Sequence, residues 1–296
     1  MSKSNSKGNK FKYWTINILC IILVVVIIIC GYQIWSINNN YVQEKKVHDD
    51  VMNFKPSDNG PGGSGSLSNT DNSAGQETGA PGPDGWLGTT VWPGTTKKPG
   101  TAADNQSIYE AAKKNPDTVG WITIKNTKID YPFLQRINEV VDKGHQYYYI
   151  DHDFNNKKAK AGSIFMDYRN NRDFSNFNTI IYGHHMNNGS MFGTLKNFAD
   201  RDFFNKNTTG TIYLADRNYT LQIFAYLVIN IDVEEDINMI YGTINYNNAG
   251  EYLKYVKEKA KQYRDIGVTA NQKVVTLSTC TNVAESGRTI LIARLA

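Results

Sequence analysis

The sequence predicts a mainly β fold: a closed barrel of about eight strands, with a helix at its N-terminal end, a helix in the long loop before the last strands, and one transmembrane helix in front. Three observations predict it. A long apolar run lies near the N-terminus, a Gly- and Pro-rich segment follows, and about 190 further residues carry many short β-type runs separated by turn signals. Helices do not alternate with these runs, so a βαβ architecture is excluded.

The apolar run extends from Ile16 to Ile34. The length of this run is close to the roughly 20 residues that a helix needs to cross a hydrocarbon core about 30 Å thick. Aromatic residues bracket it, among them Trp14 and Trp35, as is typical of membrane interfaces. No small-residue cleavage site follows it, which favours an uncleaved signal anchor over a signal peptide. We therefore expect residues 14–37 to span the membrane.

The charges that flank the run predict its orientation. Residues 1–13 are basic and carry no acidic side chain, whereas the far flank has a slight excess of negative charge. Positive flanks stay in the cytoplasm, so we expect a cytoplasmic N-terminus and an exported main body. The four N-terminal lysines account for the whole net charge of +4. The exported part is formally neutral and shows no basic stripe, which excludes a nucleic-acid-binding surface.

Residues 38–105 are expected to be a stalk and a flexible linker. The stretch from Pro56 to Asp104 holds six of the eight prolines and 11 of the 24 glycines. Such a composition cannot bury enough apolar surface to offset the entropy lost on ordering. Trp86 and Trp92 are unusual in a linker: they could stack on sugars, dock on the following domain or be incidental.

Residues 106–296 are expected to form one domain with one core. Ser107 is the expected N-cap of a short helix over 108–114. A second helix is expected near Glu251–Tyr263, where apolar residues fall on one face, and a third, short helix at Ser190. The expected strands are Gly120–Ile124, Lys128–Tyr131, Gly162–Asp167, Thr179–Gly183, Thr211–Leu214, Leu221–Ile231, Lys273–Thr279 and Thr289–Ala293.

One cysteine can lie outside the membrane. The chain has three, and Cys20 and Cys30 both belong to the apolar run, so Cys280 is a lone exported thiol. An unpaired cysteine in an oxidising space forms an intermolecular pair or is a free reactive thiol. Its position at the end of a β-type run favours the reactive thiol; the alternative is a small buried apolar residue.

A cysteine nucleophile needs a proton-transferring partner and a donor for the developing oxyanion. His184 and His185 follow an apolar strand and Gly183, where a barrel presents side chains at its rim. Arg288 begins the strand after that of Cys280, and two antiparallel neighbours would bring both to one rim. A histidine doublet can also bind metal, but other ligands at a suitable spacing are lacking, so no metal site is expected.

These residues carry a resemblance to a known family. The chain resembles the sortases, and within them class B. The matching stretches are residues 115–122, 129–132, 161–170, 178–192 and 276–280, with the downstream arginine. The resemblance implies a sortase-like barrel and a membrane-anchored cysteine transpeptidase of Gram-positive bacteria that needs no cofactor. Such enzymes cleave a C-terminal sorting signal after its threonine, hold the acyl group as a thioester, and transfer it to a peptidoglycan amine.

Carried onto this chain, the resemblance makes Cys280 the nucleophile, His184 the general acid and base, and Arg288 the oxyanion donor. His184 is chosen because the family histidine directly follows the glycine, and because alternation places His184 and His185 on opposite faces. The residues expected to line the substrate groove are Tyr182, Ser278 and Thr279.

The implied partners are secreted proteins with a C-terminal sorting signal, the amine of a peptidoglycan precursor, and the membrane through residues 14–37. The implied location is the cell membrane, with a single pass and an extracellular catalytic domain. Two alternatives remain open: a cysteine peptidase that hydrolyses the same type of peptide, and a non-catalytic wall-binding module in which Cys280 is a core residue. General anchoring is favoured over pilus polymerisation.

Overall fold

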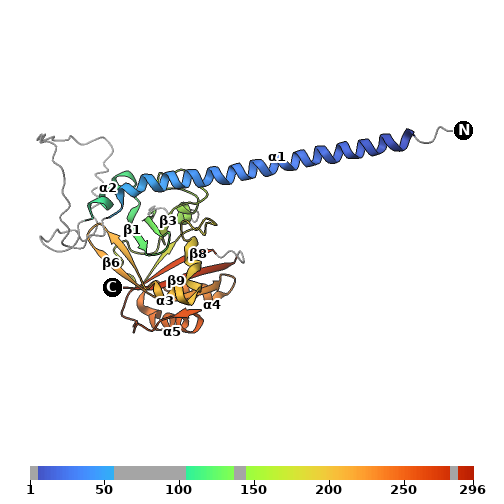
Figure 1. Ribbon diagram of the computed structural model, residues 1–296. Helices are drawn as coiled ribbons and strands as arrows, with labels where there is room; N and C mark the ends of the chain where they lie inside the picture. The colour runs from blue at the N-terminus through green and yellow to red at the C-terminus, as the bar shows by residue number, and fades with distance from the viewer. Residues whose placement is uncertain (1–5, 57–104, 137–144, 281–285) are drawn as a thin grey trace, which may run out of the picture.

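The computed structural model describes residues 6–56, 105–136, 145–280 and 286–296 (Figure 1). The expected flexible linker, with its two tryptophans, lies almost wholly in 57–104 and so outside the described residues. The first five residues of the expected cytoplasmic segment also lie outside them.

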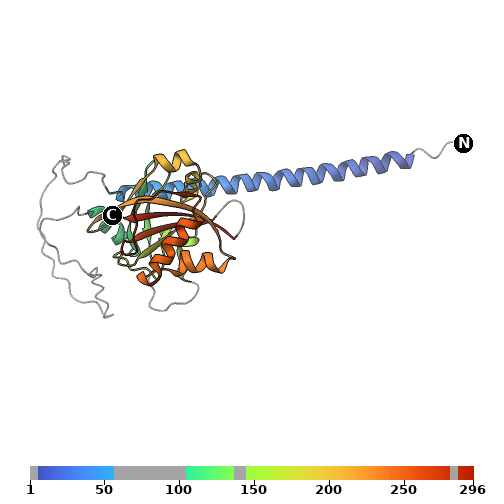
Figure 2. The same ribbon diagram turned by 90° about the horizontal axis from the view of Figure 1, so that it is seen from below.

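Helix α1 (Ser6–Val51) begins before the expected membrane span and continues through the expected stalk without a break (Figures 1 and 2). Among the described residues it is the one helix long and apolar enough to cross a membrane, judged by length and composition, and the mean hydropathy of its apolar window is 2.8. The apolar side chains described between Ile18 and Ile34 are exposed. The expected membrane helix is therefore present as a candidate anchor.

The C-terminal end of α1 rests on the barrel. Val51 is buried, the His48 ring lies 4.8 Å from that of Tyr131, and α1 continues into the short 3-10 helix η1 (Met52–Phe54). Just beyond it, Lys55 Nζ lies 2.6 Å from a carboxylate oxygen of Asp130 on strand β2. These contacts fix the last turns of α1 against the barrel.

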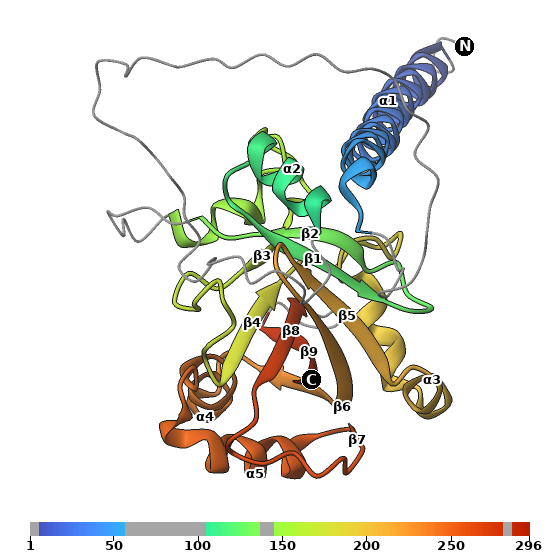
Figure 3. The ribbon, with the colours of Figure 1, turned by 90° about the vertical axis from the view of Figure 1, so that its left-hand side faces the viewer.

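Eight strands close into the predicted barrel (Figure 3). Their order is β5-β1-β2-β3-β4-β8-β9-β6, and β6 pairs back with β5; a ninth, β7, adds to β6. The pairs β2–β3 and β4–β8 are parallel and the others antiparallel. The strands are β1 (Thr118–Ile124), β2 (Asp130–Leu134), β3 (Ile164–Met166), β4 (Asn178–Tyr182), β5 (Thr209–Leu214), β6 (Asn218–Asn230), β7 (Gln262–Tyr263), β8 (Val274–Cys280) and β9 (Gly287–Leu295).

Both faces of the central strands are buried. Inward residues such as Ile181 and Leu277 belong to the cluster that fills the barrel. Outward residues such as Ile290 and Val274 belong to a second cluster, which the α5 region covers. Burial of each such side chain contributes about 1.5–3 kcal/mol, which explains why these strands are almost continuously apolar in sequence.

The expected helix before the cysteine strand is α5 (Ala249–Lys259). It ends before Tyr263, because the Lys261 amide donates to the Tyr226 carbonyl and the chain then pairs with β6 as β7. α4 (Glu234–Ile237), the π-helical turn η4 (Asn238–Gly242) and the 3-10 turn η5 (Tyr246–Asn248) precede it. α4 and α5 lie on the side of the barrel opposite α1 (Figures 1 and 3).

The helix expected to start at Ser190 does not form there. Met191 has φ +52°, a left-handed conformation that cannot belong to a right-handed helix. The chain instead forms the 3-10 helix η3 (Gly193–Ala199) and then α3 (Arg201–Lys206).

The first helix of the domain, α2 (Gln106–Lys114), is present, but Ser107 is not its N-cap. Asn105 holds that position, and its side-chain amide donates to the Leu214 carbonyl and to the side-chain oxygen of Asn218. The polar residue at the helix start therefore ties the helix to the sheet instead of capping it.

Candidate active site

The candidate residues come together where β4, β8 and β9 end. β4 and β8 run parallel, with Tyr182 beside Ser278, and the Gly183 amide donates to the Ser278 carbonyl at 3.2 Å. On the other side of β8, Cys280 is the register partner of Arg288. His184 lies two residues beyond Tyr182, so all three candidate catalytic positions meet at one rim of the barrel.

Register also assigns these positions to faces. Directly paired residues of neighbouring strands share a face, and a step of two along a strand returns to it. Ser278 and Tyr182 share the outer face; Cys280 follows two positions after Ser278 in β8, and Arg288 is its partner in the ladder. The three positions therefore lie at neighbouring strand ends, and their catalytic roles stay a prediction.

The His184 ring is held by the backbone of a distant segment. Its Nε2 lies 2.6 Å from the carbonyl oxygen of Ile150, the last residue of the 3-10 helix η2 (His145–Ile150). A carbonyl can only accept, so Nε2 carries the proton of this hydrogen bond and, in neutral His184, Nδ1 is the ring nitrogen with a free lone pair.

His185 has different surroundings. Neither of its ring nitrogens, both buried, has a hydrogen-bond partner in the described part of the chain. Burial, followed by the charge of Lys196, lowers the pKa of the His185 imidazole, so it is neutral at pH 7. The two adjacent histidines therefore differ: a hydrogen bond orients the ring of His184, whereas the ring of His185 accepts no hydrogen bond from the described residues.

Arg288 is half-buried on β9 and donates one guanidinium hydrogen bond to the carbonyl of Gly287 at 2.8 Å. Its register partners are Cys280 on one side and Ile229 of β6 on the other. A planar guanidinium at this position can offer further N–H groups to an oxygen near the rim.

An aromatic wall covers the outer face next to these residues; it consists of Tyr147, Phe165, Tyr182 and Tyr241. The Tyr182 ring lies 6.1 Å from that of Tyr241, 5.3 Å from that of Phe165 and 6.5 Å from that of Tyr147. The Tyr241 hydroxyl is 2.7 Å from Oγ of Ser278. Sequence reasoning found Tyr182 and Ser278 but not Tyr241, because its contact with the cysteine strand spans 37 residues of sequence.

A buried carboxylate supports this wall from behind. The Tyr182 hydroxyl donates to Asp167 at 2.8 Å, and Arg169 donates two hydrogen bonds to the same carboxylate. Burial would raise the pKa of Asp167, but the hydrogen bonds and charge of Arg169 outweigh it, so the pKa lies below its usual range. The same surroundings raise the pKa of Tyr182 well above its usual value, first through burial.

Thr279 alternates with Ser278 along β8 and faces the inside of the barrel. Both residues are buried, and the Thr279 hydroxyl has no hydrogen-bond partner among the described residues. Within the same residues, no group of three or more histidine, cysteine or acidic side chains is placed to hold a metal ion.

Comparison with known proteins identifies this arrangement. A model of the sortase domain matches residues 122–296. The chain belongs to the sortase family. The sortase B of Listeria monocytogenes is 38% identical to it over 185 residues, covering 62% of this chain and 71% of the relative. The sortase B of Staphylococcus aureus is 31% identical over 194 residues, covering 63% and 74%.

Solved sortases have the same fold. The crystal structure of Clostridium perfringens sortase B superposes with a TM-score of 0.56 at 31% identity, covering 64% of this chain and 98% of that chain. The complex of Staphylococcus aureus sortase B with a substrate gives 0.56 at 29% identity, covering 64% and 85%. These relatives are class B enzymes, so the chain is a class B sortase, and sortases are cysteine transpeptidases.

Proposed function

We propose that this sortase cleaves a C-terminal sorting signal after its threonine and joins the protein to a peptidoglycan amine through a thioester on Cys280. The observation that carries the proposal is the register that brings Cys280 to Arg288 on one side and to the end of the His184 strand on the other.

In the first half-reaction the Cys280 thiolate attacks the carbonyl carbon of the threonine. Arg288 donates hydrogen bonds to the oxyanion, a contribution of about 3–4 kcal/mol for one well-placed donor. The peptide C–N bond then breaks, and the leaving amine takes a proton from His184. A thioester remains on the enzyme.

In the second half-reaction an acceptor amine attacks the thioester. His184 takes a proton from the amine, the C–S bond breaks, and the thiolate of Cys280 is restored. Since Nε2 of His184 donates to Ile150, Nδ1 is the atom that exchanges the proton in this conformation. Tyr182, packed among the other rings of the aromatic wall, and Ser278 contact the sorting signal. A contact of Thr279 with the signal, which the resemblance also implies, stays a prediction.

The anchor and domain boundaries belong to the same proposal: residues 14–37 cross the cell membrane of a Gram-positive bacterium, 1–13 lie in the cytoplasm, and 106–296 catalyse outside. Secreted substrates and lipid-linked wall precursors both occur at the outer membrane surface, so anchoring raises the effective concentration of enzyme for both.

The product separates this function from the alternative of a cysteine peptidase. The full chain in detergent is incubated with a pool of peptides that each contain one central threonine, together with an amine. The proposal predicts ligated product ending in Thr–amine, identified by mass spectrometry. The amines tried are triglycine and Nα-acetyl-lysine. If hydrolysed peptide is the only product with both amines, the result favours the peptidase.

A further inference from the structure

A second cavity, of about 740 Å³, lies along the open edge of β6. β5 pairs with β6 only as far as Gln222, and β7 covers only Ala225 and Tyr226. From there to Asn230 no strand of the described chain pairs with this edge. η3, α5 and the end of β9 surround the resulting space, which we call the β6-edge cavity.

This cavity lies directly beside the candidate catalytic residues. Gly287 and Thr289, which flank Arg288 on β9, line it. His185, the neighbour of His184, lines it from the β4 side. None of the four residues of the aromatic wall lines the β6-edge cavity, so the two surfaces are distinct. Two substrates could therefore reach the rim along separate paths.

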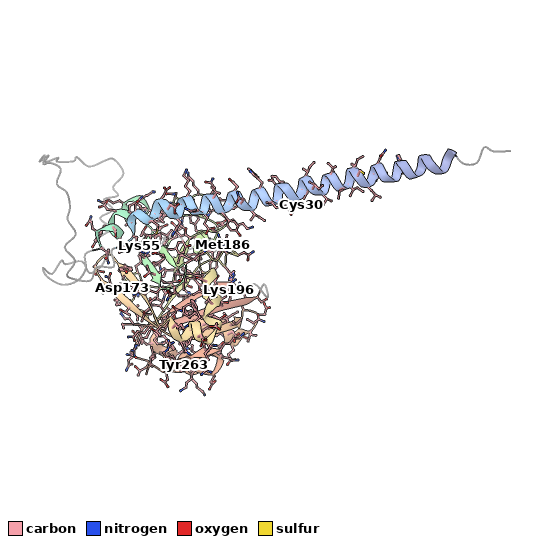
Figure 4. The ribbon with its side chains drawn as sticks, viewed as in Figure 1. Cys30, Lys55, Asp173, Met186, Lys196 and Tyr263 are labelled. Carbon is pink, nitrogen blue, oxygen red and sulfur yellow. The ribbon has the colours of Figure 1, made fainter. Side chains whose placement is uncertain are left out.

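The charge of the cavity is positive. Lys196 from η3, Lys259 from α5 and Lys261 just after α5 line it, against one acidic residue, Asp236 (Lys196 is labelled in Figure 4). Asp236 is already committed: it accepts hydrogen bonds from the Asn230 amide and the Tyr255 hydroxyl. Lys259 is partly neutralised, since its Nζ is 3.5 Å from a carboxylate oxygen of Glu235.

The other two lysines have no acidic partner in the part of the chain that the structure describes. Within the described residues no carboxylate oxygen lies within 4 Å of the ammonium of Lys196 or Lys261, so these two side chains can attract an anion entering the cavity.

One polar side chain that lines the cavity lacks a partner among the described residues: neither buried ring nitrogen of His185 makes a hydrogen bond there. The hydroxyl of Thr279, the register partner of the lining residue Thr289, is likewise unpaired within that part of the chain. Leaving a buried polar group unpaired is costly, and a bound molecule that supplies the missing partner removes this cost. A neutral imidazole accepts a hydrogen bond from an amine N–H.

We propose that the β6-edge cavity binds the acceptor, holding a carboxylate of an amine-bearing peptide between Lys196 and Lys261 while the amine lies against His185 and points to the rim at Cys280. This inference rests on the proposed function, because it assigns the second substrate of that reaction to a place.

The test measures the partition of the acyl-enzyme. The full chain is acylated by an active peptide from the threonine-centred pool, and the ratio of ligated to hydrolysed product is followed against acceptor concentration. This ratio does not depend on how fast the thioester forms. Two matched acceptor pairs differ only in the carboxylate: Nα-acetyl-lysine with its amide, and triglycine with triglycinamide.

For at least one pair, the wild type should reach a given ratio of ligated to hydrolysed product at a roughly fivefold to tenfold lower concentration of the carboxylate form than of the amide form. This is the effect expected of two partly screened ion pairs. The double variant Lys196→Glu/Lys261→Glu should lose this preference, and so should the wild type in 1 M salt. The matched control Lys206→Glu/Lys254→Glu changes the same number of exposed charges outside the cavity and should keep it.

Equal use of the carboxylate and amide forms by the wild type would overturn this assignment, as would a preference that survives in the Lys196→Glu/Lys261→Glu variant. Both results leave acylation and ligation in place, so they are distinct from a failure of the proposed function, in which either no acyl-enzyme forms or hydrolysed peptide is the only product.

Discussion

Gly162→Ala should damage catalysis from a position outside the rim. Gly162 has φ +57°, and a Cβ atom there would lie 2.4 Å from the carbonyl oxygens of both Tyr149 and Ile150. The Ile150 carbonyl accepts the hydrogen bond from Nε2 of His184. Any shift that relieves the new contact therefore moves the group that orients the candidate general base.

Two costs add in the folded state. A left-handed conformation costs a residue with a Cβ about 1–2 kcal/mol, and a forced backbone shift costs about 1–3 kcal/mol more. We expect the free energy of unfolding to fall by about 2–5 kcal/mol. Loss of the hydrogen bond to His184, worth about 0.5–1.5 kcal/mol, should slow acylation about twofold to tenfold.

Gly267→Ala is the matched control. Gly267 also has a left-handed φ, +67°, but a Cβ there would meet nothing within 4 Å. This variant should show the conformational cost alone, with wild-type acylation. Thermal unfolding gives the stability of both variants, and single-turnover acylation followed by mass spectrometry gives the rates. A folded Gly162→Ala enzyme that is destabilised but acylates at the wild-type rate would refute the positioning role of the Ile150 carbonyl.

Three further predictions concern the site itself. Arg288→Lys should slow acylation about 100-fold or more, since Lys lacks the planar fork, and a near-normal rate would argue against the oxyanion role. His184→Ala should lose about 100- to 10,000-fold in ligation rate while His185→Ala keeps acylation, and the reverse pattern would reassign the base. Asp167 has a lowered pKa in the folded state, so its contribution to stability is present above its unfolded pKa of about 4 and is lost as the pH falls through the lower folded value. The free energy of unfolding should therefore decline less steeply between about pH 5 and pH 3 in Asp167→Asn than in the wild type, and equal slopes in urea titrations would contradict this.

Local sequence patterns were sufficient to predict the strands of the barrel. Each of the eight expected strands is present, because runs such as Thr179–Gly183 combine β-branched residues with flanking turn signals. The short β7 was not predicted: Gln262 and Tyr263 continue a helical pattern in sequence, and only their pairing with β6 removes them from α5. Tertiary pairing here overrides local preference.

Of the site, only the contacts between strands that are adjacent in sequence could be predicted. Cys280 and Arg288 follow from two strands adjacent in sequence, so their pairing could be inferred. The bond from His184 to Ile150 joins residues 34 apart through a non-repetitive segment, and no local pattern signals it. Strand alternation, by contrast, separates Ser278 from Thr279 in the sequence itself.

The most direct test of the account is the intact mass of the full chain after incubation with the threonine-centred peptide pool and an acid quench, which preserves thioesters. We predict an increase equal to the peptide fragment that ends in threonine, mapped to Cys280, released by hydroxylamine and absent from Cys280→Ala. An adduct on another residue, or ligation by Cys280→Ala at the wild-type rate, would contradict it.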